Sequence, residues 1–246
     1  MSHPSASNPI GTPITELPSI DSTNNYALAK VHAGLAQHGM AFFAHEQVQG
    51  KGQRGKSWSS GKDTSVILSV VVNPKSLLLS QQFHLSACVA VSVYEFFSTH
   101  AGDDTAIKWP NDLYWQDRKA GGILIENVVR GGTDDRGQMT DDQSAWQWSV
   151  IGIGININQE HFSKELKNPV SLRQITGKEF DPLELAKQIC GKLDKNLNVL
   201  SAGVGGFEKI LSLYNDHLYK WNEKVKLKRA AGFLKRQLKA FRKPED

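Results

Sequence analysis

The chain has 246 residues, a formal net charge of +4, and a composition that is 39% hydrophobic and 22% charged. This composition is that of an ordinary soluble protein. No apolar run approaches the ~20 residues that a membrane-spanning helix needs, so no membrane partner is expected. The length favours one core domain with a small appendage.

The N-terminal segment is polar and rich in serine and proline, and it lacks the apolar run of a signal peptide. We expect a loose leader over residues 1–12 and a core domain over residues 13–220. Cys88 and Cys190 both stand in apolar helical patterns, which indicates buried free thiols in a reducing cytoplasm. No CxxC pair or cluster of histidines indicates a zinc site.

The positive charge is concentrated at the C-terminal end. Residues 220–246 hold ten Lys and Arg residues against three acidic ones, whereas residues 1–219 hold nineteen against twenty-two. A basic tail can indicate a nucleic-acid partner. The solvated face of a small appendage is the favoured interpretation, because no pattern of base-stacking aromatic residues accompanies the charges.

The first half of the chain mixes helix and strand signals. Residues 21–35 begin with four helix-capping residue types and continue with apolar residues at helical spacing, which predicts a helix. Residues 39–47 are strand-like, and the β-branched run at 65–72 predicts a buried strand. Residues 80–100 predict a long helix.

Strands dominate the middle of the chain, and helices follow. We predict strand, turn and strand over 105–115, a strand at 119–129, an acidic hairpin tip at 130–144, a strand at 145–158, and helices near 182–200 and 206–220. Strands that adjoin through short turns, with helices in blocks, are typical of an α+β fold. The expected architecture is a mixed, largely antiparallel sheet flanked by helices.

The stretch GKGQRGKSW at residues 50–58 satisfies the P-loop pattern GxxxxGK[ST]. A P-loop requires a helix directly after its lysine and hydroxyl residue, because the helix N-terminus helps to hold the phosphates. Here WSSGKDTS and then a strand follow. A P-loop triphosphatase is therefore disfavoured.

The loop nevertheless has the chemistry of an anion-binding segment. Its glycines allow backbone N–H groups to converge on an anion, and its cations add positive charge. These residues are Gly50, Gly52 and Gly55 with Lys51, Arg54 and Lys56. A charged surface hairpin is the alternative, and the apolar anchor Trp58 directly after the loop argues against it.

Three more fragments place polar residues beside glycines or turns. IKWPND sets Lys108 next to a rigid turn with Asn111 and Asp112, whose oxygens suit Mg²⁺ or hydrogen bonds. RKAGGILIE puts Lys119 ahead of two glycines. GIGININ contributes Gly152, Gly154, Asn156 and Asn158. Each fragment alone also fits simple packing, and Lys119 alone fits a solvated lysine at a strand start.

In this order and spacing the fragments closely resemble those of biotin–protein ligases. The matching pieces are STNN at 22–25, EQVQGKGQRGKSW at 46–58, KWPNDLYW at 108–115, RKAGGILIE at 118–126 and IGIGININ at 151–158. The resemblance implies the catalytic fold shared with class II aminoacyl-tRNA synthetases and lipoate ligases. It also implies a reaction: biotin and ATP form biotinyl-5′-AMP, and a lysine of a biotin carboxyl carrier protein then displaces AMP.

The resemblance implies roles for the residues at matching positions. Lys119 would bridge the reacting carboxylate and phosphate as the main catalytic residue, with Lys51 and Asp112 as the others. Asp112 alternatively orients the incoming lysine. Biotin-binding residues would be Ser22, Thr23, Asn24, Gln47, Lys51, Gly52, Gln53, Lys119 and Gly122, with Gly122 admitting the ureido end. ATP and adenylate would contact Gly50, Arg54, Gly55, Lys56, Trp58, Asn111, Gly154 and Asn156. Mg²⁺ would arrive with ATP, with Asn111, Asp112 and Asn156 as candidate ligands.

The sequence departs from the family pattern in three places. The loop typically reads GRGRRGR, so Gln53 replaces a charge and suggests weaker retention of the adenylate. No helix-turn-helix precedes Ile14, which predicts a monofunctional enzyme that does not bind operator DNA. Members usually end with a small β-barrel, and residues 221–246 are interpreted as a basic remnant of it. A truncated end would reduce activity.

Other readings stay open at this point. A lipoate–protein ligase or octanoyltransferase would share the lysine and the fold but not the glycine loop together with KWPND. A non-catalytic biotin- or RNA-binding protein would use the basic tail, and its RNA binding would be sensitive to salt. A homodimer through the sheet edge is compatible with the resemblance.

Overall fold

The computed structural model describes residues 8–129 and 146–221. Within them a seven-stranded sheet has the order β1-β2-β5-β9-β8-β7-β6. Its strands are β1 Ile14–Leu17, β2 Ala41–Ala44, β5 Ser65–Val72, β6 Thr105–Lys108, β7 Asp112–Trp115, β8 Arg118–Val129 and β9 Trp146–Asn156. Strands β1 and β2 are parallel and all other pairs are antiparallel. The predicted mixed, largely antiparallel sheet is confirmed.

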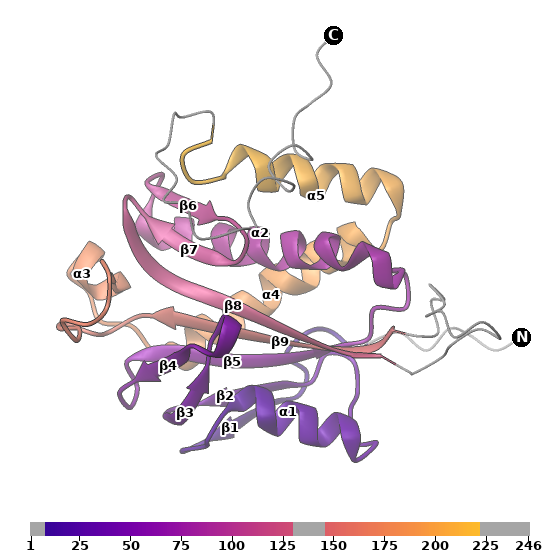
Figure 1. The fold of residues 1–246 in the computed structure, drawn as a ribbon, viewed down its shortest axis with the longest axis horizontal. Coiled ribbons are helices and arrows are strands. Elements are labelled where there is room, and N and C mark those ends of the chain that lie inside the picture. Colours follow the sequence, from indigo (N-terminus) through magenta and orange to yellow (C-terminus); the bar gives the residue numbers. More distant parts are fainter. Residues whose placement is uncertain (1–7, 130–145, 222–246) are drawn as a thin grey trace, which may run out of the picture.

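Helices cover both faces of this sheet. Figure 1 shows α2 and α5 on one side of it and α1 on the other. The helices are α1 Thr23–His32, α2 Gln82–Ala101, α3 Leu172–Thr176, α4 Pro182–Leu200 and α5 Val204–Asp216. A separate two-stranded hairpin, β3 Gln47–Lys51 and β4 Ser57–Ser60, encloses the one-turn 3-10 helix η1 Gln53–Gly55. A second short 3-10 turn, η2 Leu79–Gln81, precedes α2.

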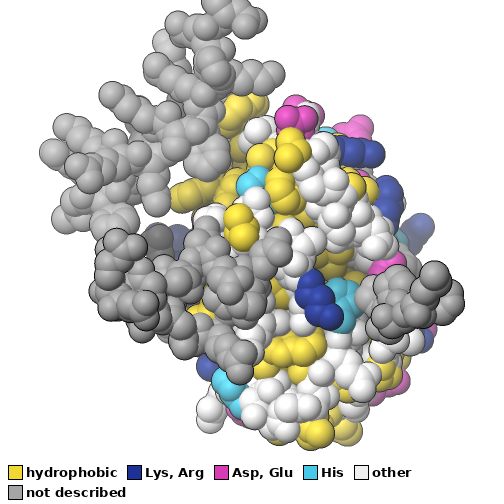
Figure 2. All heavy atoms as spheres, turned by 90° about the vertical axis from the view of Figure 1, so that its right-hand side faces the viewer, with side chains coloured by type: hydrophobic (Ala, Val, Ile, Leu, Met, Phe, Trp, Pro, Cys, Tyr) yellow, Lys and Arg dark blue, Asp and Glu magenta, His cyan; other side chains and the backbone are white. Residues whose placement is uncertain are grey.

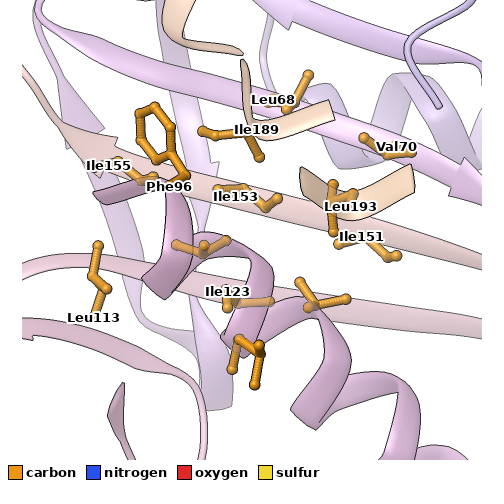
Figure 3. Close-up of a cluster of buried hydrophobic side chains, with 14 of the residues drawn as sticks. Leu68, Val70, Phe96, Leu113, Ile123, Ile151, Ile153, Ile155, Ile189 and Leu193 are labelled. Carbon is orange, nitrogen blue, oxygen red and sulfur yellow. The ribbon is translucent and has the colours of Figure 1, made fainter. Parts of the chain in front are cut away.

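Alternation along the central strands separates two clusters of buried side chains. In β5, Leu68 and Val70 face α2 and α4, where they meet Ile151, Ile153 and other residues of the main core (Figure 3). The next residue, Val71, points to the other face and belongs to a smaller cluster under α1, with Phe42, Val150, Ala27 and Val31. Because both faces are covered, β5 is buried at every position, which explains its continuous apolar run.

Helix α1 begins where the sequence predicts it to begin. Ser22 is the N-cap residue, and its hydroxyl accepts a hydrogen bond from the backbone N–H of Asn25 at 3.4 Å. Small and β-branched side chains, Ala27 and Val31, let the helix lie close to the sheet. The start of α1, which carries Thr23 and Asn24, is thereby held against β5 and β9.

The structure differs from the sequence predictions at the chain's margins. The sequence predicts a loose leader over residues 1–12, yet Ile10 is 6% exposed and its N–H donates to Asp194 Oδ1 at 3.0 Å. The packed body thus extends back at least to Ile10. The predicted acidic hairpin tip and the C-terminal remnant lie outside the described residues, apart from the exposed Trp221.

Several short elements have no counterpart among the predictions. Among them are the four-residue strands β1 and β4 and the five-residue helix α3. Such lengths are too short for hydrophobic periodicity to register. Among the described residues, no helix combines the length and the apolar character that a membrane crossing requires.

Candidate active site

A cavity of about 400 Å³ opens on the α1 side of the sheet, under the β3–β4 hairpin. It brings together most of the predicted site residues from five separate parts of the chain. Those that line it are Ser22, Thr23, Asn24, Gln47, Lys51, Gly52, Gln53, Lys56, Trp58, Asn111, Asp112, Lys119, Gly122 and Gly154. Gly50, Gly55 and Asn156 do not line it, and the side chain of Arg54 lies outside what the structure describes.

One end of the cavity holds an ion pair. Lys119 Nζ donates to Asp112 Oδ1 at 2.6 Å, and the two side chains are 37% and 26% exposed. Asp112 stands opposite Gly122 across β7 and β8, and a Cβ on Gly122 would lie 3.6 Å from Lys119 Nζ. Gly122 therefore lies at the ion-pair end of the cavity, so its expected role of admitting the ureido end does not agree with a ligand whose carboxylate meets Lys119.

A β-bulge turns Lys119 toward the cavity. The register steps from Leu113 opposite Gly121 to Tyr114 opposite Lys119, which leaves Ala120 unpaired and buried in the core. Regular alternation would place Lys119 on the same face as Gly121, which is the core face. The extra residue reverses the alternation and brings Lys119 to the face of Asp112.

Neighbouring backbone fixes the lysine's position. The N–H of Lys119 donates to the carbonyl of Asn168 at 2.7 Å, and its carbonyl accepts from Val170 N–H at 2.9 Å. The turn before β7 is fixed as well, since Asn111 Nδ2 donates to the carbonyl of Ile123 at 2.7 Å. Both partners of the ion pair thus stand on restrained main chain.

Lys108 of the same KWPND fragment points elsewhere. Its Nζ donates to Tyr114 Oη at 2.8 Å and lies 4.4 Å from the centre of that ring. It does not line the cavity. Of Lys108 and Lys119, only Lys119 lines the cavity.

The opposite end of the cavity is a cluster of buried amides and hydroxyls. Gln47 Oε1 accepts from the backbone N–H of Thr23 at 2.8 Å and from its hydroxyl at 3.3 Å. Ser69 Oγ lies 2.7 Å from Thr23 Oγ1 and 2.6 Å from Asn24 Oδ1, and its single proton can be donated to either oxygen. Asn24 Nδ2 donates to Glu126 Oε2 at 2.8 Å. Sequence patterns assign no role to Ser69 or Glu126, because only the fold brings these two strand residues to Asn24.

Two glycines of β9 form a floor without side chains. A Cβ on Gly152 would lie 2.3 Å from Asn24 Oδ1, and one on Gly154 would lie 2.8 Å from Cε2 of Trp58. Neither position accepts even alanine without displacement of its neighbour. The indole of Trp58 therefore rests on Gly154, and its Nε1 is buried with no hydrogen-bond partner among the described residues.

The glycine loop is a hairpin and not a P-loop. After Lys56 the chain continues as strand β4, which confirms that no helix follows. A Cβ on Gly50 would lie 2.3 Å from the carbonyl oxygen of Trp58 and 2.4 Å from Gln47 Nε2, so Gly50 permits the close approach of the two strands. Gly55, with φ of +74°, ends the η1 turn.

The remaining predicted polar residues have structural partners. Asn156 Nδ2 donates to the carbonyl of Val170 at 3.1 Å, and Asn158 Nδ2 donates to the carbonyl of Phe180 at 2.8 Å. No group of three His, Cys, Asp or Glu residues within the described ranges could hold a metal ion. The metal-ligand roles of Asn111, Asp112 and Asn156 stay predictions.

The charge in the cavity suits an anionic ligand. Lys51, Lys56 and Lys119 line it against the single carboxylate of Asp112. Just before α1, a hydrogen bond from the side chain of Asn25 lowers the pKa of the Asp21 carboxyl. The cavity thus joins a cationic end to a neutral, hydrogen-bonding end.

Comparisons with known proteins agree with this geometry. The chain is 33% identical over 162 residues to the bifunctional ligase/repressor BirA of Escherichia coli (strain K12), which is 64% of this chain and 44% of that protein. It is 31% identical over 173 residues to a biotin–[acetyl-CoA-carboxylase] ligase of Paracoccus denitrificans, which is 67% of this chain and 64% of that protein. The matches thus cover 44% and 64% of the lengths of these two relatives.

Solved structures agree as well. The biotin protein ligase from Aquifex aeolicus in complex with biotin and ATP superposes with a TM-score of 0.67 and 25% identity, covering 83% of this chain and 78% of that one. The model of the biotin/lipoate A/B protein ligase family matches residues 16–139, which is half of the chain. The chain therefore belongs to the biotin/lipoate A/B protein ligase family.

Proposed function

We propose that this chain is an ATP-dependent biotin–protein ligase that forms biotinyl-5′-AMP and transfers the biotinyl group to a lysine of a biotin carboxyl carrier domain. The observation that carries the proposal is the two-ended cavity. It joins the Lys119–Asp112 pair to a cluster of amides and hydroxyls across a floor of glycines. A bicyclic urea with an acidic tail fits these two ends.

Strand geometry sets the distance between the two ends. Gly122, beside the ion pair, and Glu126, beside Asn24, are four residues apart on β8. At about 3.3 Å per residue they are separated by roughly 13 Å. An extended ligand with its ring near Asn24 would therefore bring its carboxylate near Lys119.

The first step joins two anions. A carboxylate oxygen of biotin attacks the α-phosphorus of ATP, the new P–O bond forms, and pyrophosphate leaves with the electron pair of the broken bond. Positioning and charge compensation can supply most of the rate without a covalent enzyme intermediate. In this step Lys119, which lines the cavity, would contact both reacting groups, and Lys51 and Lys56 on the hairpin would neutralise the phosphates.

The second step moves the acyl group to the carrier. The amine of the carrier lysine attacks the carbonyl carbon of the adenylate, the C–N bond forms, and AMP leaves as the amine loses a proton. Asp112 is the carboxylate that lines the cavity at the reacting end, and it would orient the incoming lysine. Mg²⁺ would enter as part of the ATP complex.

Two further features, the unpaired indole N–H of Trp58 and the position of the β3–β4 hairpin, support the proposal of a bound adenylate. The buried Nε1 of Trp58 needs an acceptor, since an unpaired buried N–H costs free energy. An oxygen or ring nitrogen of the ligand would supply one. The β3–β4 hairpin, which forms no ladder with the main sheet, carries Gly52 and Gln53 over the cavity as a cover.

The structure disfavours the alternative substrates. A lipoyl or octanoyl group has no N–H or C=O groups at its far end to pair with the polar cluster around Asn24 and Gln47. Figure 2 shows Lys and Arg side chains at several places among hydrophobic and polar groups on one face. The possibility of RNA binding by the basic tail concerns residues outside the described ranges.

Biotin-dependent exchange of labelled pyrophosphate into ATP tests the proposal. We expect exchange that requires biotin, ignores lipoate and falls about 10²–10³-fold in Lys119→Ala, because a preorganised charge is lost. Lys108→Ala is the matched control, since that lysine faces Tyr114 and not the cavity. A native protein that exchanges equally with lipoate, or a Lys119→Ala protein as active as native, would contradict the proposal.

A further inference from the structure

Glu126 contacts the cavity only through another residue. Its Oε2 accepts a hydrogen bond from Asn24 Nδ2 at 2.8 Å, but Glu126 is not among the residues that line the cavity. Its position on β8 is two residues beyond Leu124, on the same face of the sheet. The Glu126 carboxylate, behind the polar end of the cavity, can therefore act on the orientation of the Asn24 side chain.

The surroundings of Asn24 determine which way its amide points. Nδ2 lies 2.8 Å from the Glu126 carboxylate and 3.4 Å from the carbonyl oxygen of Leu124. Both are groups that only accept, so the NH₂ group must face them. Oδ1 must then face the Ser69 hydroxyl, 2.6 Å away, and the position above Gly152.

The amide of Gln47 is fixed in the complementary sense. Its Oε1 accepts from the backbone N–H of Thr23, a group that only donates. Its NH₂ group therefore points away from Thr23. A Cβ on Gly50 would lie 2.4 Å from Gln47 Nε2, so this NH₂ group lies beside Gly50, whereas Asn24 Oδ1 provides an acceptor at the polar end of the cavity.

We propose that Glu126 is a positioning residue for substrate recognition: it fixes the amide of Asn24 so that this end of the cavity presents an acceptor to an N–H of the ureido ring. The inference rests on the proposed function, because biotin supplies that ring. A reversed Asn24 amide would set its carbonyl oxygen against a carboxylate and forfeit a charge-assisted hydrogen bond. Without Glu126, only the long contact to Leu124 would oppose reversal.

The first test separates recognition of biotin from chemistry. We expect Glu126→Ala to raise the Kd and the KM for biotin about tenfold while kcat and the KM for ATP stay within about twofold, because only the ring contact is disturbed. Glu126→Gln should stay within about threefold of native, since its amide oxygen can accept the same bond.

A matched control lies next to Glu126 on the same strand. Asn127 donates to Gln82 Oε1 at 2.7 Å and accepts from Ser149 Oγ at 2.8 Å, on the opposite face from Asn24. Asn127→Ala removes polar contacts from the same part of β8. It should leave the KM for biotin unchanged, whereas a general weakening of this strand would raise it in both variants.

A pair of substitutions tests whether residue 24 must present a hydrogen-bond acceptor to the ligand. Asn24→Asp sets two carboxylates against each other, and we expect it to bind biotin more weakly than Glu126→Ala does. Adding Glu126→Gln supplies an NH₂ donor to the new carboxylate, so the double variant should regain about tenfold in affinity over Asn24→Asp alone. Two independent structural lesions would instead add, and the double variant would be the weakest.

The outcomes divide cleanly between the two proposals. A native protein that binds no biotin by calorimetry refutes the proposed function and this inference with it. A native protein that binds biotin refutes the inference alone if Glu126→Ala binds equally well, if that variant loses kcat and biotin affinity in parallel, or if the double variant is weaker than Asn24→Asp.

Discussion

Asp112 Oδ1 and Lys119 Nζ lie 2.6 Å apart inside the cavity because a bulge at Ala120 brings them to the same face of the sheet. The pair is partly exposed, so its contribution to folding is limited to about 1 kcal/mol. Its importance lies in where it holds the lysine ammonium. The restrained backbone of Lys119 and the carboxylate of Asp112 together orient that ammonium at the reacting end.

Asp112→Asn should separate stability from activity. The amide keeps the size of the side chain and one acceptor but loses the charge that holds Lys119. We expect pyrophosphate exchange to fall about tenfold or more, while the free energy of unfolding changes by less than about 1 kcal/mol. Exchange and a urea melt on the same preparations measure both. Unchanged exchange would show that Lys119 is positioned by its backbone alone.

Gly154→Ala should impair both ligand binding and folding. Its Cβ would lie 2.8 Å from the Trp58 ring, so the indole and the hairpin that carries it must shift. We expect a loss of about 1–3 kcal/mol in unfolding free energy, as for other overpacked sites, and weaker biotin binding. Gly191→Ala is the control, because a Cβ there meets nothing within 4 Å. Equal melting midpoints for the two variants would contradict this packing.

Gln53→Arg should slow the release of the adenylate. Gln53 lines the cavity on the η1 turn of the hairpin, where an arginine would add a charged fork able to hold phosphate in two contacts. We expect the dissociation rate of biotinyl-5′-AMP to fall by about tenfold, as for other charge-assisted hydrogen bonds. Stopped-flow displacement measures it. Equal rates would rule out a role for this position in retention.

Both cysteines should be inert in the folded protein. Burial raises the pKa of the Cys88 thiol and of the Cys190 thiol to about 12, from 9.0. At pH 8 we expect labelling by a thiol reagent only after unfolding. An unfolded thiol ionises above pH 9 while the folded one stays protonated, so stability should fall between pH 9 and 12. Replacing both cysteines with alanine should flatten the pH dependence of the melting midpoint in that range.

Sequence reasoning identified the residues of the site better than their arrangement. The capped helix start around Ser22 and the buried run of β5 depend on local chemistry, and both were predictable from a few adjacent residues. Lys119 on the cavity face was not predictable from alternation, because a bulge is a property of two paired strands and only one of them carries the extra residue. The family resemblance supplied that placement instead.

Other parts of the site depend on partners distant in sequence. Ser69 and Glu126 stand on two different strands, and only the folded structure brings both to Asn24. Asn156 carries the right residue type in the right motif, yet its amide is bonded to the Val170 carbonyl away from the cavity. A sequence motif predicts the residue types near a site, but the packing of the fold determines which of their side chains line the cavity.

Alternate residues of strand β8 contribute to the core and to the cavity side of the sheet, so substitutions along this strand should have alternating effects. Ile123 and Ile125 pack in the core, whereas Gly122, Leu124 and Glu126 face the ligand side. Saturation mutagenesis should therefore produce two interleaved phenotypes, with loss of protein abundance at one set of positions and loss of activity at normal abundance at the other. The phase of that alternation should reverse at Ala120.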